Sequence, residues 1–145
     1  MDENNIVALM VRDHCKIEKL LDKLEENIDK DYEKMKESFH EFEWVLEKHL
    51  FTEEKAIFTQ YTPDDVSQGY KMLPELTQQH NYIVNKLNNW RDDISKGNKL
   101  GGFYEFKKYL IKHRTFEEKD VYPKLDQALN DKQKNQILSR INEMV

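Results

Sequence analysis

Apolar residues recur every three or four positions along most of the chain, the spacing that places them on one face of an α-helix. One such stripe runs from Ile6 to about Ile28, and a second from about Tyr32 to Gln60. Polar residues interrupt the apolar face of the second stripe. Trp44, which lies in the same segment, is expected to pack in the core. The first half of the chain is therefore predicted to form two long amphipathic helices.

A third helix is predicted to begin at Thr62-Pro63-Asp64-Asp65, where Thr62 caps the helix and Pro63 takes the first helical position. Its apolar stripe includes Trp90 and continues toward Gly97. Pro74 lies inside the stripe, and its ring removes a backbone hydrogen-bond donor. We therefore expect a bend near Lys71.

A fourth helix is predicted from about Phe103 to Leu125, after the connection that Gly101-Gly102 closes. Asn130-Asp131 can cap a short fifth helix, which is expected to pack on the end or side of the others. Connections this short force neighbouring helices to run antiparallel. The prediction is an all-α fold, an antiparallel up-down-up-down four-helix bundle with a short additional C-terminal helix, in one domain spanning 1–145.

Composition agrees with this fold and excludes several functions. Charged residues make up 35% of the 145 residues and hydrophobic residues 38%, with only 4 Gly and 3 Pro. The net charge is −5 and the basic residues are scattered, so nucleic acid is not an expected partner. No apolar run approaches a membrane span, and 1–5 carries acids where a signal peptide needs bases. The single cysteine, Cys15, is expected to be half-buried, and a cytoplasmic location fits best.

The two halves of the chain resemble each other. The segments Lys48–Phe58 and Lys112–Tyr122 share Lys, His, Glu, Glu and Lys at matching places, followed by Ile or Val and by Phe or Tyr. The first and third helices align less strictly around His14 and His80. The chain therefore reads as two helical hairpins, each with a histidine at a comparable place on each helix.

This repeat brings a set of metal-binding side chains onto apolar helix faces. Residues four apart differ by about 40° around a helix, so the His and Glu of each His-x3-Glu pair lie on the same face. Apolar residues on that face predict that both pairs point into the core. The candidate metal ligands are His14, His49, Glu53, His80, His113 and Glu117.

Burying these six groups is costly unless something satisfies them, and a pair of metal ions does so. Two carboxylates can each bridge both ions, leaving two histidines per ion, and this donor set suits iron, manganese or zinc. Open coordination positions would then remain for a small molecule. The competing hypothesis is a bundle that binds zinc or nothing, with the histidines as hydrogen-bonded, pH-sensitive core groups.

Other polar residues near these positions are expected to have lesser roles. His40 lies half a turn from His49 and should face solvent. Glu54 and Glu118 are expected at the surface or behind a ligating histidine. Glu18 is a minor candidate for an extra ligand. Tyr109 is expected to be a core residue, although its hydroxyl is the best placed for a metal-bound species.

The first and third predicted helices each carry one His, and the second and fourth each carry a His-x3-Glu pair. This pattern resembles that of the hemerythrin-like HHE cation-binding family. The resemblance covers nearly the whole chain. It implies a non-haem di-iron centre, with Glu53 and Glu117 bridging two irons. It assigns His14 and His49 to one iron and His80 and His113 to the other.

The chain departs from oxygen-carrying hemerythrins at two positions. They have an additional histidine where this chain has Leu76, and an aspartate where it has Glu118. Members that repair iron centres usually carry an additional cysteine-containing N-terminal domain, which we do not expect here.

The resemblance thus implies a protein that binds or reacts with oxygen, nitric oxide or peroxide. Its expected role is sensing, scavenging, or the handling of iron and oxidative stress. The alternative is a di-iron redox enzyme that reduces peroxide or nitric oxide or repairs iron centres.

Overall fold

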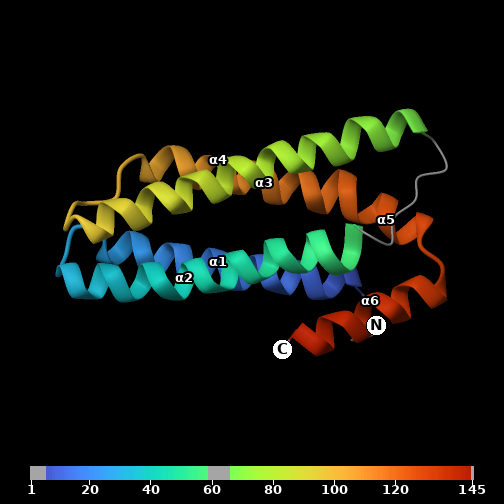
Figure 1. Ribbon diagram of the computed structural model, residues 1–145, viewed down its shortest axis with the longest axis horizontal. Coiled ribbons are helices and arrows are strands. Elements are labelled where there is room, and N and C mark those ends of the chain that lie inside the picture. The colour runs from blue at the N-terminus through green and yellow to red at the C-terminus, as the bar shows by residue number, and fades with distance from the viewer. Residues whose placement is uncertain (1–5, 59–65, 145) are drawn as a thin grey trace.

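The computed structural model describes residues 6–58 and 66–144, and within these ranges the secondary structure consists of helices joined by short turns, without strands (Figure 1). The prediction of an all-α fold is therefore confirmed. The elements in chain order are α1 (Ile6–Asn27), α2 (Tyr32–Thr52), η1 (Glu53–Ile57), α3 (Val66–Ser95), α4 (Phe103–Phe116), η3 (Glu117–Val121), α5 (Tyr122–Ala128) and α6 (Asp131–Met144).

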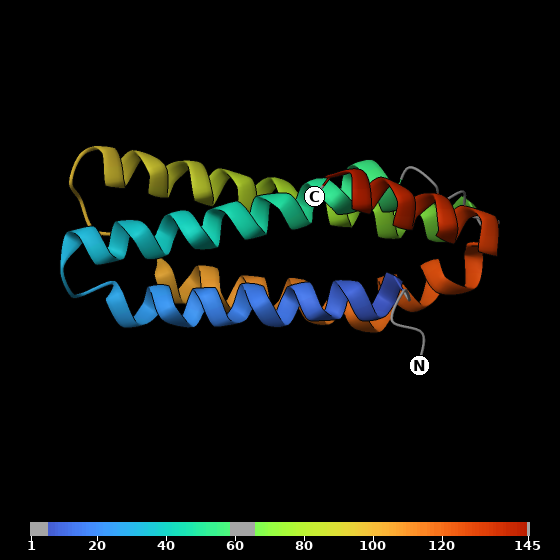
Figure 2. The ribbon, with the colours of Figure 1, turned by 90° about the horizontal axis from the view of Figure 1, so that it is seen from below.

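The four long helices lie lengthwise beside one another (Figures 1 and 2). The turn between α1 and α2 and the connection between α3 and α4 lie at the same end of the molecule, on the left in both views. The helix predicted after Asn130 is α6, which folds back against η1: Ile137 and Ile57 share a buried cluster, and Arg140 Nη1 donates to the Lys55 carbonyl over 3.2 Å.

Local sequence explains where several helices begin. The Asp31 side chain accepts a hydrogen bond from the Glu33 amide over 3.1 Å and caps α2. Before α6, the Asn130 side chain accepts from the Gln133 amide over 2.8 Å, and the Gln133 side chain accepts from the Asn130 amide over 2.9 Å. This reciprocal pair is a capping box. Gly102, which precedes α4, has a φ of 69°, which glycine adopts without steric cost.

The start of α3 lies partly outside the described residues. The predicted capping segment 62–65 is among the residues that the structure does not describe. From Val66 onward α3 is continuous and includes Pro74. The bend expected near Lys71 stays a prediction.

Two hydrophobic clusters flank one polar layer along the helices. In α1, for example, Met10 belongs to one cluster, Ile17 belongs to the other, and His14 lies between them. The larger cluster contains Trp90, which is fully buried and donates from Nε1 to the Gly101 carbonyl over 2.8 Å. The polar layer is therefore held in place by apolar packing on both sides.

Two expectations about single side chains are wrong. Trp44 is 71% exposed, since it lies five residues before the inward His49 and thus about 140° away around the helix. Cys15 is exposed because it lies about 100° from its inward neighbour His14. Among the residues that the structure describes, no helix is long and apolar enough to cross a membrane.

Candidate metal centre

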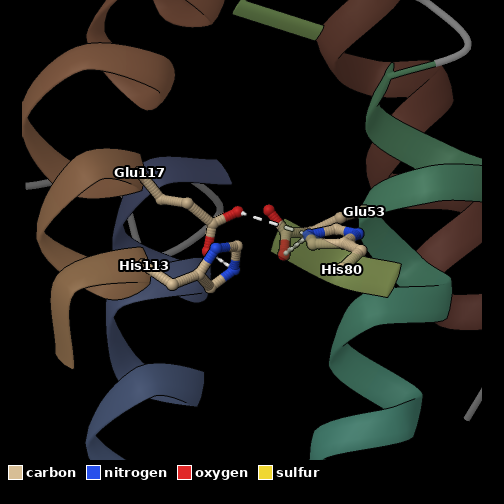
Figure 3. Close-up of side chains that lie close together, drawn as sticks. All are labelled: Glu53, His80, His113 and Glu117. Atoms are coloured by element: carbon tan, nitrogen blue, oxygen red, sulfur yellow. Dashed lines mark ion pairs between the residues drawn. The ribbon is translucent and has the colours of Figure 1, made fainter. Parts of the chain in front are cut away.

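The six predicted ligands meet in the polar layer between the two clusters, and all are buried. They come from α1, α2, η1, α3, α4 and η3, and are His14, His49, Glu53, His80, His113 and Glu117. Figure 3 shows four of them pointing toward one another. The Nε2 atoms of His14 and His49 are 3.1 Å apart, and the rings of His80 and His113 have centroids 5.1 Å apart. The histidines thus form two pairs, one in each hairpin.

Each carboxylate lies near histidines of both pairs. Glu53 Oε1 is 2.9 Å from His49 Nε2 and 3.6 Å from His80 Nε2. Glu117 Oε1 is 3.1 Å from the Nε2 atoms of both His14 and His113. The two carboxylates therefore lie between the histidine pairs, as bridging groups would.

The other ring nitrogen of each histidine has a partner outside the centre. Glu118 Oε1 lies 3.2 Å from His14 Nδ1, and Glu54 Oε1 lies 3.0 Å from His80 Nδ1. Both glutamates thus lie behind a histidine, as expected, and the Glu54 side chain is at the same time 50% exposed. Such a partner fixes the orientation of an imidazole and directs Nε2 inward.

The same support for the remaining two histidines was missed in the sequence. Asp13 Oδ2 lies 3.3 Å from His49 Nδ1, and Gln79 Oε1 lies 2.6 Å from His113 Nδ1. A signal existed, because Asp13 precedes His14 and Gln79 precedes His80, at matching places of the repeat. Each of these residues supports a histidine on the other helix of its own hairpin.

Both glutamates of the centre begin a π-helical turn. The Phe58 amide donates to the Glu53 carbonyl, and the Tyr122 amide donates to the Glu117 carbonyl, each five residues back. π-helical turns are rare in proteins, and those that occur are often found at functional sites. Since a π-turn has more residues per turn, the residue five after each glutamate comes closer to the glutamate's own face than in an α-helix.

The second of these turns brings Tyr122 into the centre. Its hydroxyl donates to Glu53 Oε2 over 3.2 Å and lies 3.2 Å from His14 Nε2. The expectation for Tyr109 is wrong in this respect: its ring is only partly buried and lies 3.9 Å, centroid to centroid, from that of Tyr82. An α-helical spacing rule does not place Tyr122 inward, so its position in the centre could not be predicted from the sequence pattern.

Burial and contacts within the centre shift the pKa values of its residues, upward for Glu53 and His49 and downward for Glu117. Burial and the nearby Glu117 raise the pKa of Glu53 well above its ordinary value. Burial acts to raise the pKa of Glu117 too, but close polar contacts with Glu53 and with the histidines set it well below its ordinary value. Burial acts to lower the pKa of His49, but Glu53 and Asp13 outweigh it and the pKa is well above the ordinary value. The centre by itself therefore retains protons that a cation would displace.

The donor set also fits a cation through the atoms that it leaves unsatisfied. The Nε2 atoms of His80 and His113, Oε1 of Glu53 and Oε2 of Glu117 are buried and form no hydrogen bond with any described residue. Buried polar atoms rarely lack a partner. All four atoms belong to one group of residues that could hold a metal ion, Glu53, His80, His113 and Glu117. A second such group, His14, His49 and Glu117, shares only Glu117 with the first.

An apolar pocket adjoins the centre. It is lined by His14, His49 and His113 and by leucine and isoleucine side chains from α1, α2 and α4. Glu18 and Arg114, which also line the pocket, form an ion pair with each other. Glu18 is therefore engaged by Arg114, and the structure does not bring it among the ligands.

His40 behaves as expected of a residue outside the centre. Its side chain is 54% exposed, and its Nδ1 lies 3.3 Å from Oε2 of Glu43 in the same helix. Of the five histidines, only this one faces solvent.

The family model for the hemerythrin HHE cation binding domain matches residues 5–125 of the chain. Neither a curated protein nor a solved structure matches it. The matched segment contains all six residues of the polar layer and both π-helical turns. The chain belongs to the hemerythrin HHE cation-binding domain family, and its buried histidines and glutamates form a site suited to a metal cation.

Proposed function

We propose that the protein is a non-haem di-iron protein, folded as a single domain over 1–145 in an antiparallel up-down-up-down four-helix bundle. The proposed ligands are His14, His49, Glu53, His80, His113 and Glu117. The observation that carries the proposal is the convergence of four imidazoles, each supported at Nδ1, on two buried carboxylates. Family membership supports the same assignment.

The arrangement supports one ion between His14 and His49, a second between His80 and His113, and bridging by both glutamates. Glu117 supports this best, because its two oxygens lie within 4.0 Å of histidines of both pairs. Imidazole and carboxylate donors suit iron, and also manganese or zinc. Bound iron would supply redox chemistry and open coordination positions for oxygen, nitric oxide or peroxide.

We propose that the protein binds such a ligand and thereby senses it, scavenges it, or handles iron and oxidative stress. The apolar pocket beside His14, His49 and His113 supports this function, because a small uncharged molecule enters an apolar space at little cost. The second candidate is a di-iron redox enzyme that reduces peroxide or nitric oxide. The buried Tyr122 hydroxyl favours it, since such a group can donate a hydrogen bond to a reacting ligand.

Metal analysis of the purified protein tests the proposal, with His113→Ala as the disruptive variant and His40→Ala as the control. We expect two irons per chain in the wild type and in His40→Ala, and loss of iron in His113→Ala. No stoichiometric metal, together with unchanged stability after chelation, would contradict the proposal.

Stopped-flow mixing of the reduced protein with oxygen separates the two candidates. A stable adduct that reverses under vacuum supports binding. Rapid oxidation to a resting ferric pair, or turnover with peroxide, supports the enzyme.

A further inference from the structure

The two hairpins surround the candidate centre with matched apolar side chains at one end. Met10 lies one turn before His14, and Leu76 lies one turn before His80; both are buried in the same hydrophobic cluster. Ile57 and Val121, four residues after the two glutamates, are also matched, fully buried and members of this cluster. This end of the centre is thus closed symmetrically by side chains without polar atoms, apart from the sulfur of Met10.

The next matched pair breaks the symmetry. Phe58 follows one π-helical turn and Tyr122 follows the other. The Phe58 ring lies 6.1 Å from the His80 ring with 30° between their planes, and the Tyr122 ring lies 5.7 Å from the His14 ring with 25° between the planes. The two rings therefore occupy equivalent places, and the main chemical difference between them is one hydroxyl group.

This hydroxyl is directed into the centre and away from water. The Tyr122 side chain is 1% exposed, and its oxygen lies 3.2 Å from both Glu53 Oε2 and His14 Nε2. A phenol has one proton to donate and can accept as well. Because the group is buried away from water, a hydrogen bond from it is stronger than the same bond in water.

We infer that Tyr122 is a specificity-determining residue. Its hydroxyl favours the binding of a small, hydrogen-bond-accepting ligand in the half of the centre around His14. The inference rests on the proposed di-iron function and adds to it the ligand's chemical class and side. Ligands that carry negative charge when bound gain most, since hydrogen bonds to charged acceptors are about twice as strong as neutral ones. Among the described residues, the ring of Phe58 lies beside His80 at the place that the Tyr122 ring has beside His14, and it carries no hydroxyl.

The test compares azide binding by the oxidised, iron-loaded protein in four forms, using azide as an anionic probe followed by absorption. Tyr122→Phe removes the hydroxyl and places the same side chain at position 122 as at position 58. Tyr104→Phe is the matched control, because the same atom is lost from a side chain that is 73% exposed. The double variant Tyr122→Phe/Phe58→Tyr moves the hydroxyl to the other half.

We expect Tyr122→Phe to keep two irons per chain and to bind azide about 10- to 100-fold more weakly, the range for a lost hydrogen bond to a charged group. Tyr104→Phe should match the wild type, and the double variant should regain part of the lost affinity. A Mössbauer spectrum provides a readout that packing alone would not move: the two irons should be more alike in Tyr122→Phe than in the wild type.

Two results would overturn the inference while the di-iron proposal stands. The first is unchanged azide affinity in Tyr122→Phe with two irons retained, which would limit the hydroxyl to holding Glu53. The second is loss of iron from Tyr122→Phe, which would make Tyr122 part of the metal-holding set. A wild-type protein that binds no iron would instead contradict the proposed function itself.

Discussion

Replacement of Asp13 tests whether the partners at Nδ1 hold the histidines for a metal. Asp13 Oδ2 lies 3.3 Å from His49 Nδ1, and Gln79 Oε1 has the equivalent place at 2.6 Å from His113 Nδ1. In Asp13→Ala the His49 ring loses this acceptor. In Asp13→Asn it keeps a neutral one, which is the arrangement that the other hairpin already has.

The size of the effect follows from the contact and its exposure. Losing such a partner typically costs 10- to 100-fold in metal affinity. Because the Asp13 side chain is 45% exposed, solvent screens it, and we expect Asp13→Ala at the lower end, about 10-fold or ~1.4 kcal/mol. A neutral acceptor retains roughly half of a charge-assisted bond, so Asp13→Asn should cost about threefold.

Competition with a chromogenic chelator measures the dissociation constants of the two metal ions. The matched control is Asp92→Ala, since Asp92 is 60% exposed and pairs with Lys96 just beyond the end of α3. It should leave both constants unchanged. Equal affinity in Asp13→Ala and the wild type would refute the supporting role, and so would a larger loss in Asp13→Asn than in Asp13→Ala.

Three further predictions concern pH, metal removal and the core. Because the pKa values of Glu53 and His49 are raised, both retain protons to higher pH without metal; metal binding should release protons and weaken as pH falls, and an indicator dye that records no release would contradict this. Removal of the metal by a chelator should lower the melting temperature. The free energy of unfolding should fall by about 2.7 kcal/mol relative to protein with free metal at 100 times its dissociation constant, and an unchanged melting temperature in scanning calorimetry would argue against a site in the folded state. Trp90→Phe, which leaves the Gly101 carbonyl without its donor and removes core volume, should cost about 1–3 kcal/mol in denaturant unfolding, and a cost near zero would count against the packing described.

The helices and the inward residues could be predicted because both follow from the α-helical period. His49 and Glu53 share a face with buried Leu46 and Ile57, so spacing alone places them inward. His40 is placed outward by the same rule, and it is exposed. The rule also places Trp44 outward, but its large apolar ring suggested burial, and the angle was the better guide.

Features that depend on local changes of period or on contacts between helices could not be predicted this way. The π-helical turns alter the period after Glu53 and Glu117, and with it the direction of Tyr122. The contacts of Asp13 with His49 and of Gln79 with His113 depend on how two helices are rotated against each other. No pattern within one helix contains that information, although the internal repeat pairs Asp13 with Gln79.

A crystal structure of the iron-loaded protein, with anomalous scattering recorded at the iron edge, tests the di-iron centre most directly. Two peaks are expected, one beside the Nε2 atoms of His14 and His49 and one beside those of His80 and His113. Glu53 and Glu117 should each reach both peaks, with nitrogen and oxygen ligands at about 2.0–2.2 Å, as in comparable metal sites. A single peak, or iron bound away from these six side chains, would contradict the centre proposed for this protein.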